Sequence, residues 1–313
     1  MRAATIRDGE VLVADHPDPQ PGHGEILVRV QAAGINGADM LQRRGAYPAP
    51  PGSPPDIPGL ELAGVVAATG PGATRFAEGD RVMAIVGGGG QAELCVVHER
   101  QAMPTPGAVQ GAAAGGLPEV FTTAHDALFG QAGLRMGERV LVSGAAGGVG
   151  TAAVQLAAAA GAHVTASVRN PELRDAVAEL GAHEVLAPDD SAEGGPYDVL
   201  LELVGGPDLE ANLRAMNRLG RIVVIGVGAG FKAEVNLLAV MGQRLRIGGS
   251  TLRARPLEEK ADTARAMERE VLPLFERGTL QVPVAETFPL DRVAEAYDRF
   301  AAGGKLGKIV LEL

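Results

Sequence analysis

The stretch RVLVSGAAGGVGTAAVQLA, residues 139–157, decides the fold. It is typical of a buried strand, a glycine-rich turn and the start of a helix, the pattern of a dinucleotide-binding fingerprint. Gly147 removes the side chain that would block a pyrophosphate, Gly150 lets the helix pack closely on the strand, and free N–H groups at the helix start attract the anion. An ordinary tight βα turn is the alternative. The predicted pyrophosphate contacts are Ala145, Gly147, Gly148, Val149 and Gly150.

Strand-like and helix-like segments alternate around this stretch, from about residue 119 to about residue 251. Such alternation builds a doubly wound parallel sheet with helices on both faces, the Rossmann arrangement. Pro171 follows Asn170 in an N-cap arrangement. Gly181 and Gly220 stand where helices need a left-handed terminator, Gly220 at the end of an expected helix DLEANLRAMNRLG.

The strand that follows the first helix, in HVTASVRNPEL (163–173), bears on the choice of cofactor. An acidic residue near its end would hold the ribose 2′-OH of NAD, but this chain has a cation with hydroxyl and amide donors instead. Arg suits a 2′-phosphate, so NADP(H) is favoured over NAD. Arg169 as a solvated loop residue is the alternative. The predicted ribose contacts are Ser167, Arg169 and Asn170.

Two further cofactor contacts are expected at the ends of later strands. Ligands of parallel α/β sheets lie across the carboxyl ends of the strands. Val204 and Gly226 stand at the ends of the fourth and fifth strands, so both should border the cofactor.

The rest of the chain predicts a second domain. Up to about residue 118, short β-branched runs between Gly and Pro clusters are typical of an irregular all-β unit. Residues 257–278 read as one long polar helix, and the closing run GKIVLEL (307–313) as a strand with no sheet of its own. We therefore expect residues 1–118 and 256–313 to form one domain and 119–255 the other, with a ligand-binding cleft between them.

Composition excludes several function classes. The chain has 313 residues and a net charge of −10, which argues against a nucleic-acid or anionic-membrane surface. Its single cysteine, Cys95, excludes an internal disulfide and any multi-cysteine metal site, and its apolar strand predicts a buried, unreactive thiol. No apolar run reaches membrane-spanning length and no signal segment is recognisable, so we expect a cytoplasmic protein.

Several segments resemble a known family. Together they are similar to the quinone oxidoreductase branch of the medium-chain dehydrogenase/reductase superfamily, and within it to the p53-inducible-gene-like NADPH:quinone reductases. The resemblance implies a GroES-like β-rich lobe, a Rossmann lobe and a homodimer formed through the Rossmann sheets. The segments that carry it are GINGADMLQRRGAYPAPPG (34–52), IPGLELAGVVAATGPGATRFAEGDRVMAI (57–85), LPEVFTTAHDALF (117–129), SGAAGGVGTAAVQLA (143–157), GSTLRARPLEEK (249–260) and GKIVLEL (307–313).

The resemblance also bears on metals. Zinc-dependent members of the superfamily hold catalytic zinc through a Cys and a His, and those positions are Asn36 and Leu60 here. An amide and an apolar side chain cannot supply the thiolate and imidazole that Zn²⁺ prefers. We therefore expect neither catalytic nor structural zinc.

The same resemblance suggests the residues of the reaction site. It places Asn36 near the nicotinamide, where its amide can bind a substrate oxygen or the cofactor ribose, although a simple turn role next to Gly37 is the alternative. Tyr47 can donate a hydrogen bond to a flat substrate, or merely pack. Thr123 falls where the family holds the carboxamide, and an N-cap role would look the same. Family positions near the nicotinamide and the neighbouring subunit are Ser250, Leu252 and Arg253. Arg253 and Arg255 either line the site or only pair with the acidic helix that follows.

These residues predict hydride transfer without a metal. Without a Lewis acid, oxidation of an alcohol is difficult, whereas reduction of a quinone or similar activated carbonyl or enone needs mainly alignment and a donor for the oxyanion. One departure is Leu173, which stands where relatives often have a phosphate-binding Lys. The alternatives are a 2-enoyl-thioester reductase and a non-catalytic NADPH-binding protein. The physiological acceptor does not follow from the fold.

Overall fold

The computed structural model describes residues 1–313, with all side chains except that of Pro207. The chain divides into two compact units. We call Met1–Thr122, Leu252–Gly303 and Lys308–Leu313 the β unit, and Thr123–Thr251 with Gly304–Gly307 the α/β unit. The borders at 122/123 and 251/252 lie close to the predicted borders at 118/119 and 255/256, and the segment 304–307 belongs to the α/β unit although the sequence assigned it to the other.

The α/β unit contains a six-stranded sheet in which every neighbouring pair of strands is parallel. Its strand order is β10-β9-β8-β11-β12-β13, so the chain first moves outward from β8 in one direction and then returns to build the other half. The predicted doubly wound fold is confirmed. The strands are β8 (Arg139–Val142), β9 (His163–Ser167), β10 (Glu184–Leu186), β11 (Tyr197–Glu202), β12 (Met216–Val224) and β13 (Arg246–Gly249).

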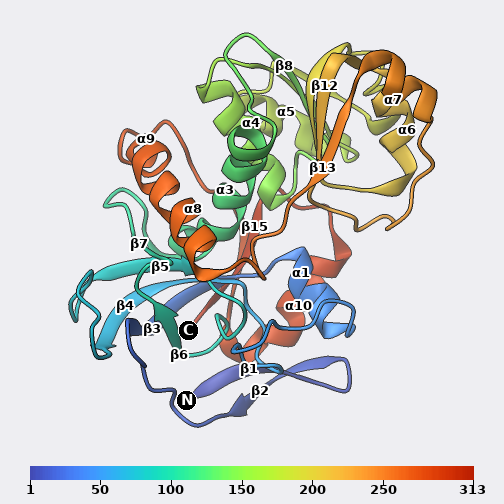
Figure 1. The fold of residues 1–313 in the computed structure, drawn as a ribbon. Coiled ribbons are helices and arrows are strands. Elements are labelled where there is room, and N and C mark those ends of the chain that lie inside the picture. Colours follow the sequence, from blue (N-terminus) through green and yellow to red (C-terminus); the bar gives the residue numbers. More distant parts are fainter. The chain divides into compact units, whose positions relative to one another are not determined.

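The helices of this unit connect its strands (Figure 1). Asn170 caps its helix as predicted, because its side-chain oxygen accepts a hydrogen bond from the N–H of Glu172. Gly181 follows a helix end with φ of +110°, as predicted. The helices are η1 (Asp126–Gln131), α4 (Gly148–Ala159), η2 (Pro171–Leu173), α5 (Arg174–Glu179), η3 (Pro188–Asp190), η4 (Gly206–Asp208), α6 (Leu209–Arg214) and α7 (Leu237–Gln243).

The prediction for Gly220 is wrong. Helix α6 ends at Arg214, and the chain enters β12 at Met216, so Gly220 lies within a strand. The left-handed residue in this region is Leu219, with φ of +69°. A Cβ on residue 220 would lie 2.9 Å from Met216 Cε, so packing explains this glycine better than helix termination does.

The β unit contains a seven-stranded sheet and a separate two-stranded ribbon of β1 and β2. The larger sheet has the order β14-β15-β3-β4-β5-β7, with β6 also paired to β3. The strands are β1 (Arg2–Arg7), β2 (Glu10–Asp15), β3 (Glu25–Gly34), β4 (Glu61–Thr69), β5 (Arg81–Ile85), β6 (Leu94–His98), β7 (Ala102–Pro104), β14 (Val284–Pro289) and β15 (Lys308–Glu312).

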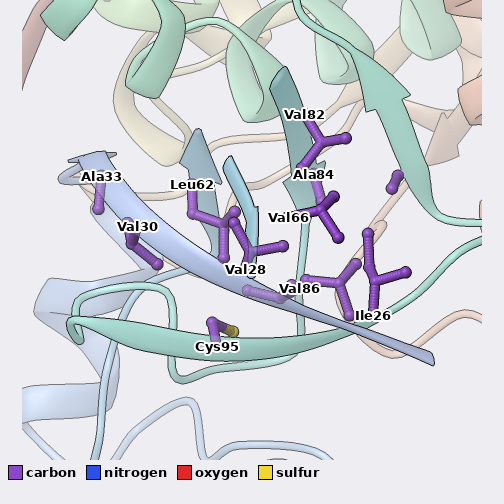
Figure 2. Close-up of a cluster of buried hydrophobic side chains, with 12 residues drawn as sticks. Ile26, Val28, Val30, Ala33, Leu62, Val66, Val82, Ala84, Val86 and Cys95 are labelled. Carbon is purple, nitrogen blue, oxygen red and sulfur yellow. The ribbon is translucent and has the colours of Figure 1, made fainter. Parts of the chain in front are cut away.

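One hydrophobic core cluster of the β unit is formed by side chains from several strands of this sheet. Figure 2 shows this cluster, which includes the alternate residues Ile26 and Val28 of β3 together with Leu62 of β4 and Val82 of β5. This alternation of buried and exposed residues is what a half-buried strand requires. Cys95 of β6 belongs to the same cluster, and burial raises the pKa of its thiol to about 12, as the predicted unreactive cysteine requires.

The C-terminal elements complete the β unit, as expected. Strand β15 pairs antiparallel with β3, and Figure 1 shows β15 in red beside β3 in blue.

The prediction of a single helix over 257–278 is wrong, because the helix is broken between Glu270 and Leu272. Pro273 lacks the N–H that would continue the first helix. The helices are α1 (Gly37–Arg43), α2 (Gly111–Gly115), α3 (Pro118–His125), α8 (Leu257–Glu270), α9 (Leu272–Glu276), η5 (Leu290–Arg292) and α10 (Val293–Ala302).

Within the described part of the chain, no helix combines the length and the apolarity needed to cross a membrane.

Candidate functional site

The glycine-rich turn joins β8 to α4 at the carboxyl edge of the parallel sheet. Gly144 has φ of +59°, and Gly147 is the extended N-cap residue of α4. A Cβ on residue 150 would lie 2.5 Å from the Gly144 carbonyl oxygen, so only glycine lets the helix start this close to the turn. A Cβ on residue 147 would meet its nearest atom at 3.4 Å, which is less restrictive. The backbone N–H groups at the start of α4 lie where a helix can attract an anion, so the pyrophosphate contact stays a prediction.

The turn is tied to the end of β9. The N–H of Ala145 donates to the carbonyl oxygen of Ser167 at 3.0 Å, and both residues are buried. The predicted pyrophosphate and ribose contacts therefore meet within one unit. The Arg169 side chain is exposed, while the Asn170 carbonyl oxygen is occupied by its capping bond to Glu172.

Arg174 is a basic residue that the sequence reasoning missed. Its Nε donates to the Val168 carbonyl oxygen at 3.3 Å, which holds the guanidinium at the end of β9. Neither Arg169 nor Arg174 forms an ion pair among the side chains that the structure describes, although the protein carries an excess of acidic residues. The sequence does indicate this position. The run RNPELR (169–174) begins a helix, and the first helical turn brings Arg174 back toward the end of the preceding strand.

The end of β11 is organised by the carboxylate of Glu202, which is 1% exposed. Its Oε1 accepts hydrogen bonds from the Ser143 hydroxyl at 2.8 Å and from the N–H groups of Val204 at 2.7 Å and Gly205 at 2.8 Å. The Ser143 hydroxyl in turn accepts from the N–H of Leu203 at 2.7 Å. This carboxylate thus joins the turn after β8 to the turn after β11. Sequence reasoning identified Val204 but missed Glu202, because a single acidic residue at a strand end has no diagnostic spacing.

Two more predicted cofactor residues lie at the same edge. Gly226 follows β12, and a Cβ there would be 2.1 Å from the Leu203 carbonyl oxygen, so the chain passes very close to the neighbouring strand end. Ser250 follows β13, and its hydroxyl donates to Asp126 Oδ2 at 2.8 Å. Because parallel strands all end at one edge, these residues share it with the glycine-rich turn. Thr123, buried in α3, also belongs to this unit.

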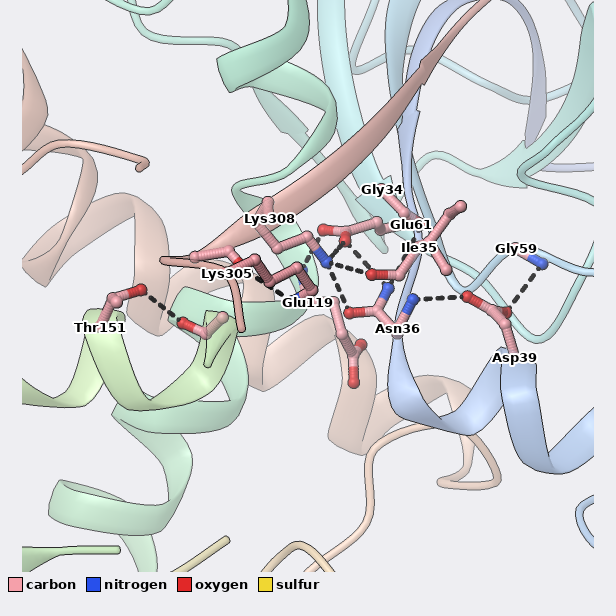
Figure 3. Close-up of polar contacts among 12 residues, drawn as sticks. Gly34, Ile35, Asn36, Asp39, Gly59, Glu61, Glu119, Thr151, Lys305 and Lys308 are labelled. Atoms are coloured by element: carbon pink, nitrogen blue, oxygen red, sulfur yellow. Dashed lines mark hydrogen bonds and ion pairs between the residues drawn. The ribbon is translucent and has the colours of Figure 1, made fainter. Parts of the chain in front are cut away.

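A second cluster of polar residues lies in the β unit around Asn36, the N-cap residue of α1 (Figure 3). The Asn36 Nδ2 group donates to Glu61 Oε1 at 2.9 Å, and Asn36 Oδ1 accepts from Lys308 Nζ at 2.7 Å. Lys308 and Glu61 themselves form an ion pair of 2.7 Å, with exposed side-chain fractions of 3% and 0%. Sequence reasoning identified Asn36 alone. Glu61 and Lys308 come from strands far apart in the chain, and no local pattern connects them.

Asp39 supports the same helix start. Its two carboxylate oxygens accept from the N–H groups of Asn36 at 2.8 Å and of Gly59 at 3.1 Å. Burial nevertheless raises the pKa of the Asp39 carboxyl to about 6, while the two backbone bonds and then Lys308 and Arg253 act to lower it. Asp39 therefore acts as a buried cap in this structure.

Arg253 and Leu252, predicted to contact the cofactor, belong to the β unit. The Arg253 guanidinium is buried and donates to the Gly87 carbonyl at 2.7 Å, the Tyr47 carbonyl at 3.0 Å and Gln42 Oε1 at 2.5 Å. It also lies 5.1 Å from the centre of the Tyr47 ring. Arg253 therefore holds the loop that carries Tyr47. The Tyr47 side chain is half-buried, and its burial raises the pKa of the phenol.

The residues around Asn36 do not fit a zinc ion. The Asn36 amide is bonded through both of its heavy atoms, Leu60 is apolar, and an ammonium group already lies against the Glu61 carboxylate. Among the side chains that the structure describes, no three His, Cys, Asp or Glu residues gather closely enough to hold a metal ion.

Two family models match two successive parts of the chain. Residues 22–130 match the alcohol dehydrogenase GroES-like domain, and residues 148–270 match the zinc-binding dehydrogenase family.

Individual relatives cover nearly the whole chain. The quinone oxidoreductase of Rattus norvegicus is 32% identical over 316 residues, which span 96% of this chain and 93% of the relative. A polyketide synthase of Streptomyces halstedii, GfsB, is 34% identical over 92% of this chain, which matches 5% of that protein. Among solved structures, an alcohol dehydrogenase superfamily protein from Novosphingobium aromaticivorans has a TM-score of 0.87 and 29% identity, covering 100% of this chain and 99% of that one.

Proposed function

The chain belongs to the quinone oxidoreductase branch of the medium-chain dehydrogenase/reductase superfamily, and we propose that it reduces a quinone or similar activated carbonyl or enone with NADPH, without zinc. Its family makes it an oxidoreductase with a nicotinamide cofactor. One observation carries this proposal. At the position where zinc-dependent relatives have a cysteine ligand, Asn36 forms a closed, buried network with Glu61 and Lys308. A donor amide in that place suits an oxyanion and not a metal ion.

The preference for NADPH is supported by the end of β9. Arg169 is exposed there, and Arg174 is anchored by its Nε, which leaves its terminal nitrogens directed away from that bond. Two guanidinium groups can neutralise a 2′-phosphate, and a planar fork of donors suits its oxygens. No carboxylate stands between Ser167 and Asn170 to hold a ribose diol.

The chain would bind the cofactor through the predicted edge of the parallel sheet. The N–H groups at the start of α4 would hold the pyrophosphate, and the Val204 turn, which the Glu202 carboxylate fixes, would border the nicotinamide side. When bound, the reduced nicotinamide supplies a hydride. A proton from solvent or a nearby group completes the two-electron reduction of a quinone to a hydroquinone.

The β unit would contribute the groups that bind the acceptor. Asn36 donates a hydrogen bond to the oxygen on which negative charge develops. Tyr47 presents a half-buried phenol on a loop held by Arg253, so it can stack on a flat acceptor or donate to its second oxygen.

A second copy of the chain is the expected partner. Strand β13 is an edge strand of the parallel sheet, and all four of its residues are exposed. The adjacent helix α7 exposes Leu237 by 70%, Leu238 by 77% and Met241 by 71%. An unpaired edge beside an apolar face suits antiparallel pairing with the same edge of a twofold-related copy. Sedimentation of the wild type and of a Leu238→Lys variant tests this proposal, which requires a dimer for the first and a monomer for the second.

A cytoplasmic location agrees with the single buried thiol of Cys95.

The resemblance to part of a polyketide synthase supports a second candidate, reduction of a 2-enoyl thioester. The same hydride donor and the same oxyanion donor would serve that reaction. A non-catalytic NADPH-binding role is the third possibility, and it predicts binding without turnover.

One experiment separates these functions. The loss of cofactor absorbance is followed anaerobically with NADPH and with NADH, in parallel with a naphthoquinone, an ortho-quinone, a simple enone and crotonyl-CoA. Faster quinone reduction with NADPH supports the proposal, and turnover confined to the thioester would replace it with the second candidate. Tight NADPH binding without turnover would favour the third. Incubation with a zinc chelator is the control for metal dependence and should leave the rate unchanged.

A further inference from the structure

The side chains of Asn36, Glu61 and Lys308 each contact the other two, and both charged groups have further hydrogen-bond partners. Lys308 Nζ donates to the Ile35 carbonyl at 2.9 Å, to Asn36 Oδ1 at 2.7 Å and to Glu61 Oε1 at 2.7 Å. Glu61 Oε2 accepts from the N–H of Glu119 at 2.8 Å. Several additional hydrogen bonds to both partners are what the burial of an ion pair requires.

The charges of this pair determine the orientation of the Asn36 amide. The amide presents its oxygen to an ammonium group and its nitrogen to a carboxylate. A flip about the terminal bond would place the NH₂ group against Lys308 and the oxygen against Glu61, with two repulsive contacts in place of two hydrogen bonds. Because all three side chains are nearly excluded from water, solvent cannot relieve that repulsion.

The fixed orientation makes the amide nitrogen the group of Asn36 that is available to a ligand oxygen. The amide oxygen faces the Lys308 ammonium group, and one hydrogen of Nδ2 is donated to Glu61. The second hydrogen has only a long contact of 3.4 Å, with the Gly34 carbonyl. A hydrogen bond of that length is weak, so this hydrogen is the one that a substrate oxygen can take.

We propose that Lys308 and Glu61 are positioning residues that hold the Asn36 amide with its oxygen toward Lys308, so that its nitrogen donates a hydrogen bond to the oxygen of the substrate. This inference rests on the function proposed above and adds two residues to it. It also restricts the class of substrate, because the group that binds at Asn36 must be a hydrogen-bond acceptor such as a carbonyl or an oxyanion.

A purely structural role is the competing explanation. Glu61 begins β4 and Lys308 begins β15, so their ion pair also links two strands of the β unit. Removal of either charge alone leaves the other buried and unpaired, which destabilises the fold whether or not Asn36 is oriented. The test therefore has to separate stability from orientation.

Three variants achieve this separation: Lys308→Met, Glu61→Gln and the double variant. In the double variant no unpaired charge remains, so the melting temperature should recover most of the loss seen in the single variants. The ammonium that selects the amide oxygen is still absent, so kcat should stay roughly 10- to 100-fold below wild type, with the dissociation constant of NADPH unchanged. Recovery of kcat together with the melting temperature would overturn the proposal, as would an unaltered kcat in Lys308→Met.

A matched control is available in the α/β unit. Arg221 and Glu138 form an ion pair of 2.7 Å that is more exposed, with side-chain fractions of 19% and 23%. Arg221→Met should lower the melting temperature and leave kcat unchanged. A comparable fall in kcat for this variant would show that lost stability, and not lost orientation, limits turnover.

A second readout does not depend on turnover. With ¹⁵N-labelled asparagine, the two Nδ2 protons of Asn36 should give separate, slowly exchanging signals in the wild type, and faster exchange with solvent in the double variant. If the wild type reduces none of the acceptors, the proposed function fails while this measurement still tests the orientation. Identical exchange in both proteins would overturn the inference even if quinones are reduced.

Discussion

The glycine-rich turn of the α/β unit and the polar network of the β unit represent two ways of building a site. The turn occupies a contiguous run, residues 143–150, and offers mainly backbone N–H groups. In the network, Asn36 contacts Glu61, 25 residues away, and Lys308, 272 residues away, through charged side chains. The geometry of the turn requires glycines, which have no side chains, whereas the geometry of the network requires each charged side chain to have its specific partner.

This difference affects what a substitution does. Loss of one group in the network leaves a buried charge or amide without its partner, so stability and orientation fail together. Of the predicted ribose contacts in the α/β unit, Arg169 is exposed and does not support the core, so its substitution should change affinity alone. The predictions below test this division from its largest consequence to its smallest.

The largest effect is expected for Gly34→Ala. A Cβ on residue 34 would lie 2.2 Å from Glu61 Oε1 and 2.9 Å from Lys308 Cε, so the ion pair cannot keep its geometry. We expect the free energy of unfolding, measured with urea, to fall by about 3–5 kcal/mol. Gly37→Ala is the control, since nothing lies within 4 Å of its Cβ. Equal stability of the two variants would contradict the crowded packing described here.

A pH-dependent effect is expected from Asp39. Its pKa is about 6 in the folded protein and near 3.8 when exposed, so the folded state keeps its proton longer than the unfolded state as the pH rises. The contribution of Asp39 to stability is therefore complete below pH 3.8 and is lost as the pH rises through 6. The shift corresponds to about 3 kcal/mol.

The measurement for Asp39 is the difference in unfolding free energy between the wild type and Asp39→Asn at several pH values. This difference should shift toward the variant as the pH rises from about 4 to 7. A difference that stays nearly constant over this range would mean that the two backbone hydrogen bonds and Lys308 outweigh burial, and that Asp39 is ionised throughout.

A smaller effect, confined to the cofactor, is expected for Arg169→Asp. The new carboxylate repels a 2′-phosphate but can accept from a ribose hydroxyl, so the dissociation constant of NADPH should rise by about 10- to 100-fold while that of NADH is spared. Stability should not change. Arg218→Asp, at an exposed position of β12, is the control for net charge. Equal losses for both cofactors would remove Arg169 from the 2′-phosphate site.

The smallest effect is expected for Tyr47→Phe. The ring and its contact with Arg253 remain, and only the phenol hydroxyl is lost. We expect quinone turnover to fall by roughly 3-fold, with the dissociation constant of NADPH unchanged. If steady-state kinetics with a quinone are identical to those of wild type, Tyr47 is a packing residue.

Features that depend on neighbours in the sequence were predicted well. Asn170 caps a helix because its oxygen needs only the N–H two residues further on. Gly150 is required because the turn itself places the Gly144 carbonyl oxygen where a Cβ of residue 150 would lie. Gly220 was misassigned for the opposite reason. Its surroundings, Met216 and Leu245, are set by the packing of β12, and this packing overrides the helical pattern of 208–219.

The sequence by itself determined the parallel sheet and the glycine-rich turn, because alternating periodicity and glycine spacing act over a few residues. The family followed from the resemblance of whole segments, and the return of the C-terminal strand to the β unit followed from its having no sheet of its own. Only the tertiary structure decided that Lys308 and Glu61 flank Asn36, that Glu202 organises the turn at Val204, and that Arg253 holds the Tyr47 loop. These contacts depend on strand register and on electrostatic interactions that become strong only when water is excluded. Neither property belongs to any one segment of the chain.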